Sequence, residues 1–148
     1  MTGNQQYPGA KALQENPLEV INRLVSAIND HDVDALTACF ADDYVNITPA
    51  HPARSFTGND QVRRNWRSIF DAIPDVQARI LRSAVQDRVV WTEWEHRGAH
   101  GHGAPHLMRG VVIFTVGTDA ITEARFFLEP VDQSDQDATA ALTHLLDR

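Results

Sequence analysis

The chain is poor in several features, and each scarcity argues against a class of protein. Its single cysteine, Cys39, can form neither an internal disulfide nor a thiolate metal site, which excludes a disulfide framework and a zinc finger and favours a reducing cytoplasm. Only 13 Lys and Arg stand against 20 Asp and Glu, and the resulting charge of −7 disfavours nucleic acid as a partner. No apolar run approaches the roughly 18 residues of a membrane span, and no segment repeats.

What is present is the sequence of one globular domain. The 148 residues are 43% apolar, which suffices for a single core. Residues 1–16 contain neither the apolar stretch nor the charge cluster of a signal peptide, so we expect a flexible N-terminal arm there. The domain itself is expected over residues 17–131, followed by a C-terminal helix or tail over residues 132–148.

Apolar residues at helical spacing predict three helices in the first half of the chain. The first spans residues 17–29, with Asn16 as its N-cap. A short second helix includes Phe40 on its apolar face, and a third, capped by Asn59 or Asp60, ends before residue 74. After the third helix, segments rich in strand formers predict an antiparallel meander over residues 76–85, 88–97, 107–116 and 120–128. One further strand is predicted earlier in the chain, at residues 44–48. This order indicates an α+β fold in which helices cover one face of a curved sheet.

Strand alternation predicts which side chains face the helices. Burying an unpaired charge costs several kcal/mol, so Glu93, Glu95 and Arg97 should face outward. Trp94 and His96 then face inward. The same reasoning turns the following side chains inward on the last two strands: Met108, Gly110, Val112, Phe114, Phe126 and Leu128.

Two consequences follow from this assignment of faces. Gly110 should leave room for a ligand, because it has no side chain. Trp91 and Phe127 should lie exposed on the outer face, which predicts a homodimer through that surface.

Short motifs occur in an order and spacing that carry more information than any one of them. They are Tyr44-x-Asn46, Phe56-Thr57-Gly58, Gly98-Ala99-His100-Gly101, and Arg109-Gly110-Val111 leading to Ile121 and Arg125-Phe126-Phe127. Together they resemble the SnoaL-like members of the nuclear transport factor 2-like superfamily over roughly residues 17–131. The resemblance implies a cone-shaped α+β barrel, with three N-terminal helices packed on a curved mixed, mainly antiparallel sheet, an enclosed apolar pocket and an added C-terminal helix.

That superfamily includes ketosteroid isomerase, SnoaL-type polyketide cyclases and limonene epoxide hydrolase, which use acid/base chemistry without a cofactor, and also non-catalytic members. Tyr44 and Asn46 match residues that help limonene epoxide hydrolase to hold its attacking water. The Arg and Asp of its central strand correspond to Trp94 and His96 here. Its second Asp, like the catalytic Asp of SnoaL-type cyclases, corresponds to Phe126, so the resemblance places no carboxylate pair in this pocket.

Three inward side chains can carry chemistry, namely Tyr44, Asn46 and His96. An imidazole can exchange a proton near neutral pH, and a phenol or an amide can hydrogen-bond to a substrate oxygen. Each of the three also has a purely structural alternative, as a core residue whose polar atoms are hydrogen-bonded within the protein. The substrate is expected to contact His51, Trp66, Ile69, Phe70, Ile73, Trp94, Met108, Gly110, Val112, Phe114, Phe126, Leu128 and Glu129. Of these, Glu129 would turn inward only if a bulge precedes Pro130.

Four histidines lie within eleven residues, a density that is typical of a metal site: His96, His100, His102 and His106. We expect no metal and no cofactor, since two of the four lie in a Gly-rich hairpin tip and no Cys or inward carboxylate completes a ligand set. The sequence predicts a cofactor-independent acid/base enzyme for a small apolar metabolite. The expected enzyme is a cyclase or isomerase of natural-product biosynthesis, with epoxide opening as one of the reactions considered. An epoxide hydrolase of the limonene epoxide hydrolase type and a non-catalytic small-molecule-binding protein remain alternatives.

Overall fold

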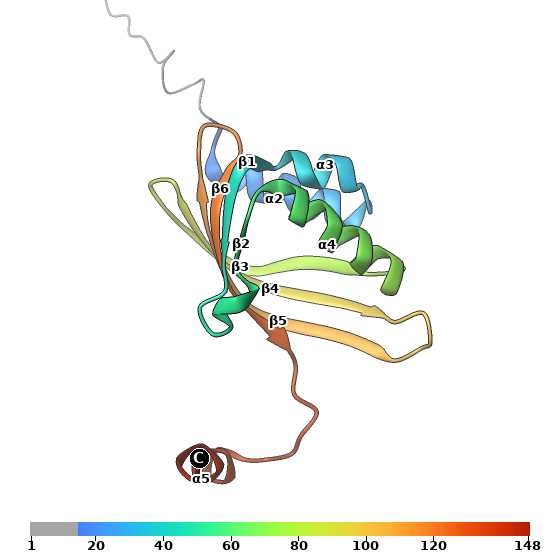
Figure 1. The fold of residues 1–148 in the computed structure, drawn as a ribbon, viewed down its shortest axis with the longest axis vertical. Coiled ribbons are helices and arrows are strands. Elements are labelled where there is room, and N and C mark those ends of the chain that lie inside the picture. The colour runs from blue at the N-terminus through green and yellow to red at the C-terminus, as the bar shows by residue number, and fades with distance from the viewer. Residues whose placement is uncertain (1–14) are drawn as a thin grey trace, which may run out of the picture.

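The computed structural model describes residues 15–148 (Figure 1). In chain order its elements are helices α2 (Pro17–Asn29) and α3 (Val33–Ala38), strand β1 (Phe40–Ile47), the 3₁₀ turn η1 (Pro52–Arg54), strand β2 (Phe56–Thr57), helix α4 (Asn59–Ala72), strands β3 (Gln77–Gln86), β4 (Val89–Ala99), β5 (Pro105–Val116) and β6 (Ile121–Pro130), and helix α5 (Ala138–Leu146). The arm predicted over residues 1–16 lies outside the described residues except for its last two.

Six strands form one mixed sheet in the order β2-β1-β6-β5-β4-β3. Strands β1 and β6 run parallel, and the other neighbouring pairs run antiparallel. The edge strands β2 and β3 do not pair with each other, so the cone is open and not a closed barrel. Figure 1 shows α2, α3 and α4 on one face of the curved sheet and α5 standing clear of it. The predicted α+β class, the cone architecture and the C-terminal helix are confirmed.

Helix α2 forms as its sequence predicts. The side-chain oxygen of Asn16 accepts a hydrogen bond from the backbone N–H of Leu18 at 2.9 Å, and Pro17 opens the first turn. The helix buries one face against the sheet, through Pro17, Val20, Ile21, Leu24, Ala27 and Ile28. Full burial of an aliphatic side chain contributes about 1.5–3 kcal/mol, so this face fixes the helix on the sheet.

Two predicted boundaries are wrong. Phe40 is the first residue of β1 and not part of the second helix, because its backbone pairs with Ile121 of β6 and its ring packs on Tyr44 at 4.7 Å. A six-residue helix is too short to compete with such pairing. Helix α4 follows Gly58 at a φ of +98°, a backbone conformation that favours glycine, and Asn59 is already inside the helix.

The predicted facing directions of the β4 side chains are confirmed, but the predicted exposure of Glu95 is not. Trp94 and His96 face the helices and are buried. Glu95 faces the outer side, yet it is only 2% exposed. Guanidinium groups from three strands cover it: Arg79 and Arg97 approach one carboxylate oxygen at 3.0 and 2.8 Å, and Arg109 approaches the other at 2.9 Å. The expectation that facing outward would spare this charge from burial is therefore wrong.

Gly110 does not open the pocket. Its φ is +153°, and a side chain on it would collide with the carbonyl oxygen of Phe127 and come within 2.8 Å of the Cα of Leu128. The glycine therefore allows β6 to approach closely, and the room predicted for a ligand is filled by backbone. The bulge considered before Pro130 is also absent, because β5 and β6 stay in register from Met108 opposite Pro130 to Phe114 opposite Ala124.

Candidate functional site

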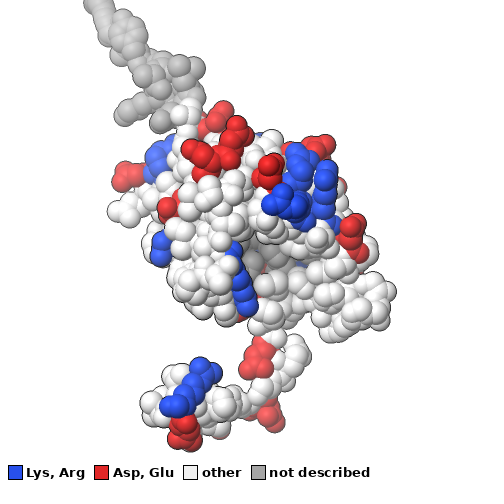
Figure 2. All heavy atoms as spheres, in the orientation of Figure 1, with Lys and Arg blue, Asp and Glu red and all other residues white. Residues whose placement is uncertain are grey.

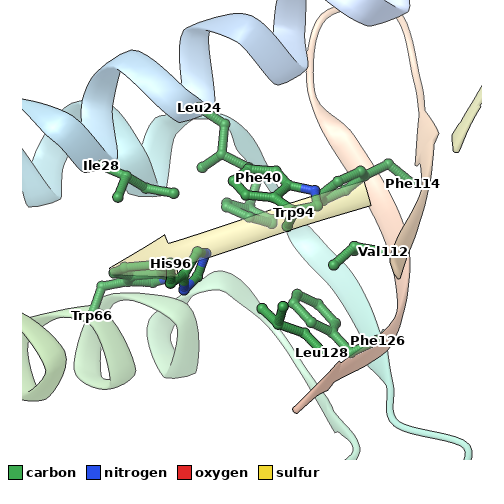
Figure 3. Close-up of a pocket in the computed structure, with 10 residues that line it drawn as sticks. All are labelled: Leu24, Ile28, Phe40, Trp66, Trp94, His96, Val112, Phe114, Phe126 and Leu128. Carbon is green, nitrogen blue, oxygen red and sulfur yellow. The ribbon is translucent and has the colours of Figure 1, made fainter. Parts of the chain in front are cut away.

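A cavity lies between the concave face of the sheet and the helices. Its inner chamber is narrow, with a volume of about 30 Å³, and holds no more than one or two water molecules. Figure 3 shows the side chains that converge on it from α2, α4 and the strands: Leu24, Ile28, Phe40, Trp66, Trp94, His96, Val112, Phe114, Phe126 and Leu128. Because aromatic and aliphatic groups fill this end of the cone, the inner chamber has no room for a molecule much larger than water.

An outer chamber of about 270 Å³ continues from the inner one and shares five lining residues with it: Phe40, Trp66, His96, Phe126 and Leu128. Figure 2 shows the hollow between α4 and the sheet, with a basic side chain at its rim. The other lining residues are Tyr44, Asn46, Thr48, Arg54, Phe56, Val62, Asn65, Ile69 and Met108. The chamber is thus mostly apolar, with three of its polar groups in a row on β1 and the residue that follows it: Tyr44, Asn46 and Thr48.

His96 lies where the two chambers meet. It is 7% exposed, and its ring stands 5.7 Å from those of Trp66 and Trp94. Burial, and secondarily the nearby His106, lowers the pKa of His96 to about 4, so the ring is uncharged at neutral pH. Within residues 15–148 its nitrogens have no hydrogen-bond partner. A buried imidazole left free in this way can bond to a ligand.

The polar groups of β1 form a directed chain of hydrogen bonds. The hydroxyl of Tyr44 donates to the side-chain oxygen of Asn46 at 2.8 Å, and the Asn46 amide donates to the hydroxyl oxygen of Thr48 at 3.3 Å. The burial of Tyr44, at 1% exposure, fixes this direction, since its hydroxyl hydrogen needs an acceptor. The Thr48 hydroxyl donates to no residue in the described part of the chain, so its hydrogen can bond to a molecule in the outer chamber.

The same chain limits what Tyr44 can do. Burial, and secondarily the charge of Glu123, raises the pKa of the Tyr44 phenol far above its usual range, so it stays protonated. Its one hydrogen is already donated to Asn46. On β4 the indole N–H of Trp94 is likewise satisfied, by the hydroxyl of Thr92 at 2.6 Å. Among the residues that line the cavity, His96 and Thr48 thus keep unused hydrogen-bonding capacity, as do the amide N–H groups of Asn65 and the guanidinium of Arg54.

The structure brings most of the predicted site residues together. Tyr44, Asn46 and His96 all line the outer chamber. Eight predicted contact residues also line the cavity: Trp66, Ile69, Trp94, Met108, Val112, Phe114, Phe126 and Leu128.

Four predicted contact residues, besides Gly110, do not line the cavity. Phe70 lies behind its wall, stacked on His31 at 4.7 Å. Ile73 is buried at the end of α4. His51 and Glu129 pair with each other at 3.1 Å outside the cavity.

Sequence reasoning missed some of the lining residues. Thr48 is two positions beyond Asn46 and shares its face within the strand predicted over residues 44–48, but it was not among the predicted site residues. Leu24 and Ile28 share the helical spacing that predicts the helix over residues 17–29, but this spacing does not show that they line a pocket. Arg54 and Asn65 gave no sequence signal, because their positions depend on how η1 and α4 cross the sheet.

The histidines of the β4–β5 hairpin lie close together. The rings of His100 and His102 are 5.2 Å apart, and those of His100 and His106 are 5.7 Å apart. No group of three His, Cys, Asp or Glu side chains in the described part of the chain is arranged to hold a metal ion. Among the described helices, none is long and apolar enough to cross a membrane.

A cone of helices on a curved sheet with a cavity at its centre defines a class of small α+β proteins with a ligand-sized pocket. Residues 21–124, more than half of the chain, match the SnoaL-like domain, and the chain belongs to that family. None of the curated proteins matches the sequence.

Solved structures with the same fold are numerous. Wild-type IdmH from Streptomyces antibioticus, a proposed polyketide cyclase, has a TM-score of 0.68 at 20% identity, covering 88% of this chain and 99% of its own. A Mycobacterium tuberculosis protein in complex with estradiol-17β-hemisuccinate has a TM-score of 0.66 at 17% identity, over 76% of this chain and 94% of its own. A hypothetical protein with a ketosteroid isomerase-like fold from Catenulispora acidiphila, in complex with trimethylamine, has a TM-score of 0.64 at 18% identity, over 72% of this chain and 82% of its own. These likenesses establish the nuclear transport factor 2-like fold.

Proposed function

We propose that the protein is a cofactor-independent enzyme that moves a proton on a small, largely apolar metabolite, as a cyclase or isomerase would. The observation that carries this proposal is His96, which is buried, uncharged at neutral pH and without a hydrogen-bond partner among the described residues, at the centre of the cavity. The description of IdmH as a polyketide cyclase and the steroid ligand of the Mycobacterium tuberculosis protein support an apolar substrate.

His96 is the group that accepts and returns the proton. With a pKa of about 4 its ring is almost entirely in the basic form at neutral pH. The bare nitrogen can remove a proton from a carbon next to a carbonyl, and the same ring can then deliver that proton to another carbon. The packing of Trp66 and Trp94 against the ring fixes its position toward the substrate.

Thr48 is the group that stabilises the developing negative charge. Its hydroxyl oxygen accepts from Asn46 and donates to no described residue, so its hydrogen can bond to a substrate oxygen. A donor in a mostly apolar cavity interacts more strongly with an enolate oxygen than it would in water. In this assignment Tyr44 and Asn46 position the Thr48 side chain through their buried hydrogen bonds.

Epoxide opening by a carboxylate pair finds no support in the cavity. Neither chamber, as far as residues 15–148 define it, is lined by an Asp or Glu. The outer-face carboxylate Glu95 is held by three arginines, and Glu129 lies outside the cavity beside His51. An epoxide hydrolase of the limonene type would need such a group at the attacking water.

A binding protein without catalysis is the second candidate. The commitment of the Tyr44 hydroxyl to Asn46 favours it, because a phenol that donates internally cannot donate to a substrate. The large share of aromatic lining would by itself bind apolar molecules.

Proton exchange separates the two functions without knowledge of the natural substrate. β-Tetralone and related bicyclic ketones would be incubated with the protein in heavy water, and loss of their α-protons would be followed by NMR. We expect exchange faster than in buffer, and a decrease of about 100-fold or more in His96→Gln. Binding would be measured by fluorescence in a Trp91→Phe background, since Trp66 and Trp94 are the tryptophans at the cavity. Ketone binding with exchange no faster than in buffer would favour the binding protein.

A further inference from the structure

The outer chamber carries a charged side chain at its solvent end. Arg54 lines this chamber, and among residues 15–148 no other Lys, Arg, Asp or Glu side chain lines either chamber. The Arg54 side chain is 62% exposed, whereas His96 is buried where the two chambers meet. Figure 2 shows a basic side chain at the rim of the hollow. The chamber thus runs from a cation at this end, called the chamber mouth below, to a neutral imidazole inside.

The guanidinium of Arg54 has only a loose partner. Its Nη1 atom lies 3.9 Å from Oε2 of Glu129, which is beyond hydrogen-bond distance, and about half of the Glu129 side chain is exposed. The other carboxylate oxygen of Glu129 already pairs with Nε2 of His51 at 3.1 Å. An exposed ion pair at such a distance contributes little, so the N–H groups of Arg54 remain available to a ligand.

Asn65 on α4 presents further donors to the same chamber. Arg64 donates to the side-chain oxygen of Gln61 at 2.7 Å, and the Gln61 amide donates to the side-chain oxygen of Asn65 at 2.7 Å. Because a guanidinium only donates, Gln61 has to offer its oxygen to Arg64 and its nitrogen to Asn65. The Asn65 oxygen is thus occupied. Its amide hydrogens donate to no described residue and are left for a ligand in the chamber.

Hydrogen bonds hold the loop that carries Arg54 in place. The backbone N–H of Thr48 donates to the hydroxyl oxygen of Ser55 at 3.1 Å, which joins the two ends of the loop. Within the loop, the N–H of His51 donates to the carbonyl of Thr48, and the N–H of Arg54 donates to the carbonyl of His51, each at 2.9 Å. Because this backbone is already ordered, less entropy is lost when Arg54 binds a ligand.

We propose that the substrate carries a carboxylate, which binds to Arg54 and Asn65 at the chamber mouth while the apolar body of the substrate extends inward to His96. A carboxylate only accepts hydrogen bonds, and a guanidinium binds it through two parallel ones, so the donors at the mouth match this group. The chain as a whole carries a charge of −7, so these local donors attract the anion and not the overall field. The inference rests on the proposed function for the position of the reacting carbon at His96.

Two ligands of the same shape that differ in charge test the acid directly. 2-Naphthylacetate and its neutral amide, 2-naphthylacetamide, would be titrated into the full-length protein by isothermal titration calorimetry. We expect the acid to bind about tenfold more tightly, because a charge-assisted hydrogen bond is stronger than a neutral one. The preference should shrink when salt is raised from about 20 mM to about 500 mM. Equal affinities, or binding of neither probe at millimolar concentration, would overturn the proposal.

Replacement of Arg54 tests whether this residue supplies the preference. Arg54→Gln should bind the acid and the amide with equal affinity, while the affinity for the amide stays within about twofold of the wild type. Arg67→Gln is the matched control, because Arg67 is an exposed arginine of α4 that does not line the chamber. It removes the same charge and should keep the preference. A preference that survives Arg54→Gln, or that is lost equally in Arg67→Gln, would contradict the site.

Removal of the carboxylate beside Arg54 should have the opposite effect. Glu129→Gln takes away a group that competes for the guanidinium and repels an anion, so the acid should bind about threefold more tightly and the amide as before. Glu93→Gln, on the outer face of the sheet, is the control and should change neither affinity. Acid binding that is unchanged or weaker in Glu129→Gln would show that Arg54 does not offer its donors to the ligand, and would overturn the proposal.

The acid site and the proton exchange can fail separately, because one is measured by binding and the other by NMR. If the wild type prefers the acid and Arg54→Gln does not, but no ketone exchanges its α-protons, the acid site stands and the assignment as an enzyme falls. If ketones exchange and His96→Gln stops the exchange, but the acid and the amide bind equally, the proposed function stands and the acid site is wrong.

Discussion

Two consecutive residues of β4 are both buried, but only one of them has hydrogen-bond partners for its side chain. Glu95, on the outer face, is 2% exposed and is hydrogen-bonded by three arginines. His96, on the inner face, is 7% exposed and has no partner in the described chain. Hydrogen bonds from Arg97 and then Arg109 hold the pKa of Glu95 at about 2, whereas burial lowers the pKa of His96 to about 4. One residue stays charged by acquiring partners, and the other stays neutral without them.

The difference separates a structural polar group from a functional one. A buried carboxylate with every oxygen satisfied has no capacity left for a ligand, and it is costly to disturb. A buried imidazole with free nitrogens lowers stability slightly in the empty protein and gains its hydrogen bonds only when a ligand arrives. Alternation along one strand thus places a structural group and a candidate catalytic group side by side in the sequence and on opposite faces of the sheet.

The largest effect is expected when His96 is replaced by an apolar residue of similar size. His96→Leu should reduce ketone α-proton exchange by about 10²–10⁴-fold, because the proton acceptor is gone. The same change should leave stability unchanged or raise it by up to about 1 kcal/mol, since no protein hydrogen bond is lost. Exchange by NMR and thermal unfolding measure the two effects. His102→Leu, on the exposed hairpin tip, is the control and should leave the exchange rate unaltered.

Glu95 should show the reverse pattern. Glu95→Gln keeps the shape but removes the charge that holds Arg79, Arg97 and Arg109 together, so the melting temperature should fall by on the order of 10 °C. Exchange per folded molecule should stay within about twofold, because the outer face does not contact the cavity. Glu93→Gln is the matched control, since the Glu93 side chain is 43% exposed and has one arginine at 3.5 Å. Equal losses of melting temperature in both variants would contradict the special role of Glu95.

Much of the fold could be predicted from the sequence, and the exceptions share a cause. Helices α2 and α4 and the four-strand meander follow from local periodicity. Phe40 was placed in a helix because its pairing partner, Ile121, is 81 positions away. The burial of Glu95 was missed for the same reason, because Arg79 and Arg109 reach it from neighbouring strands through a register that no single strand reveals.

The site was predictable to the extent that strand alternation fixed it. Period-2 alternation correctly turned Tyr44, Asn46 and His96 toward the helices. It could not show that the Tyr44 hydroxyl is occupied by Asn46, or that Thr48 ends the chain of hydrogen bonds. Those facts depend on side-chain rotamers and on the burial of the phenol, which the residue order does not encode.

The dependence of stability on pH should distinguish the two groups. The folded-state pKa of His96 lies below its unfolded value of 6.5, so His96 contributes stability above pH 6.5 that is lost as pH falls toward about 4. The Glu95 contribution is present above pH 4.5 and is lost as pH falls toward about 2. The free energy of unfolding of the wild type, measured with denaturant, should therefore decrease as the pH falls from 6.5 to 4.5. This one group contributes at most about 1.4 kcal/mol per pH unit to the decrease. His96→Leu should lack that part of the slope, and an unchanged slope would show that His96 titrates normally.

The smallest effect is expected at the end of the β1 hydrogen-bond chain. Thr48→Val removes one neutral hydroxyl donor, so exchange should fall about five- to tenfold, while Thr48→Ser should restore it because the hydroxyl returns. The Val variant also leaves the Asn46 amide without its acceptor, so thermal unfolding has to be measured beside exchange. If Ser restores stability but not exchange, Thr48 only supports Asn46. If Thr48→Ser restores both stability and exchange, and if Thr48→Val lowers kcat more than it raises KM, the hydroxyl contacts the enolate oxygen. A contact made only in the ground state would alter KM instead.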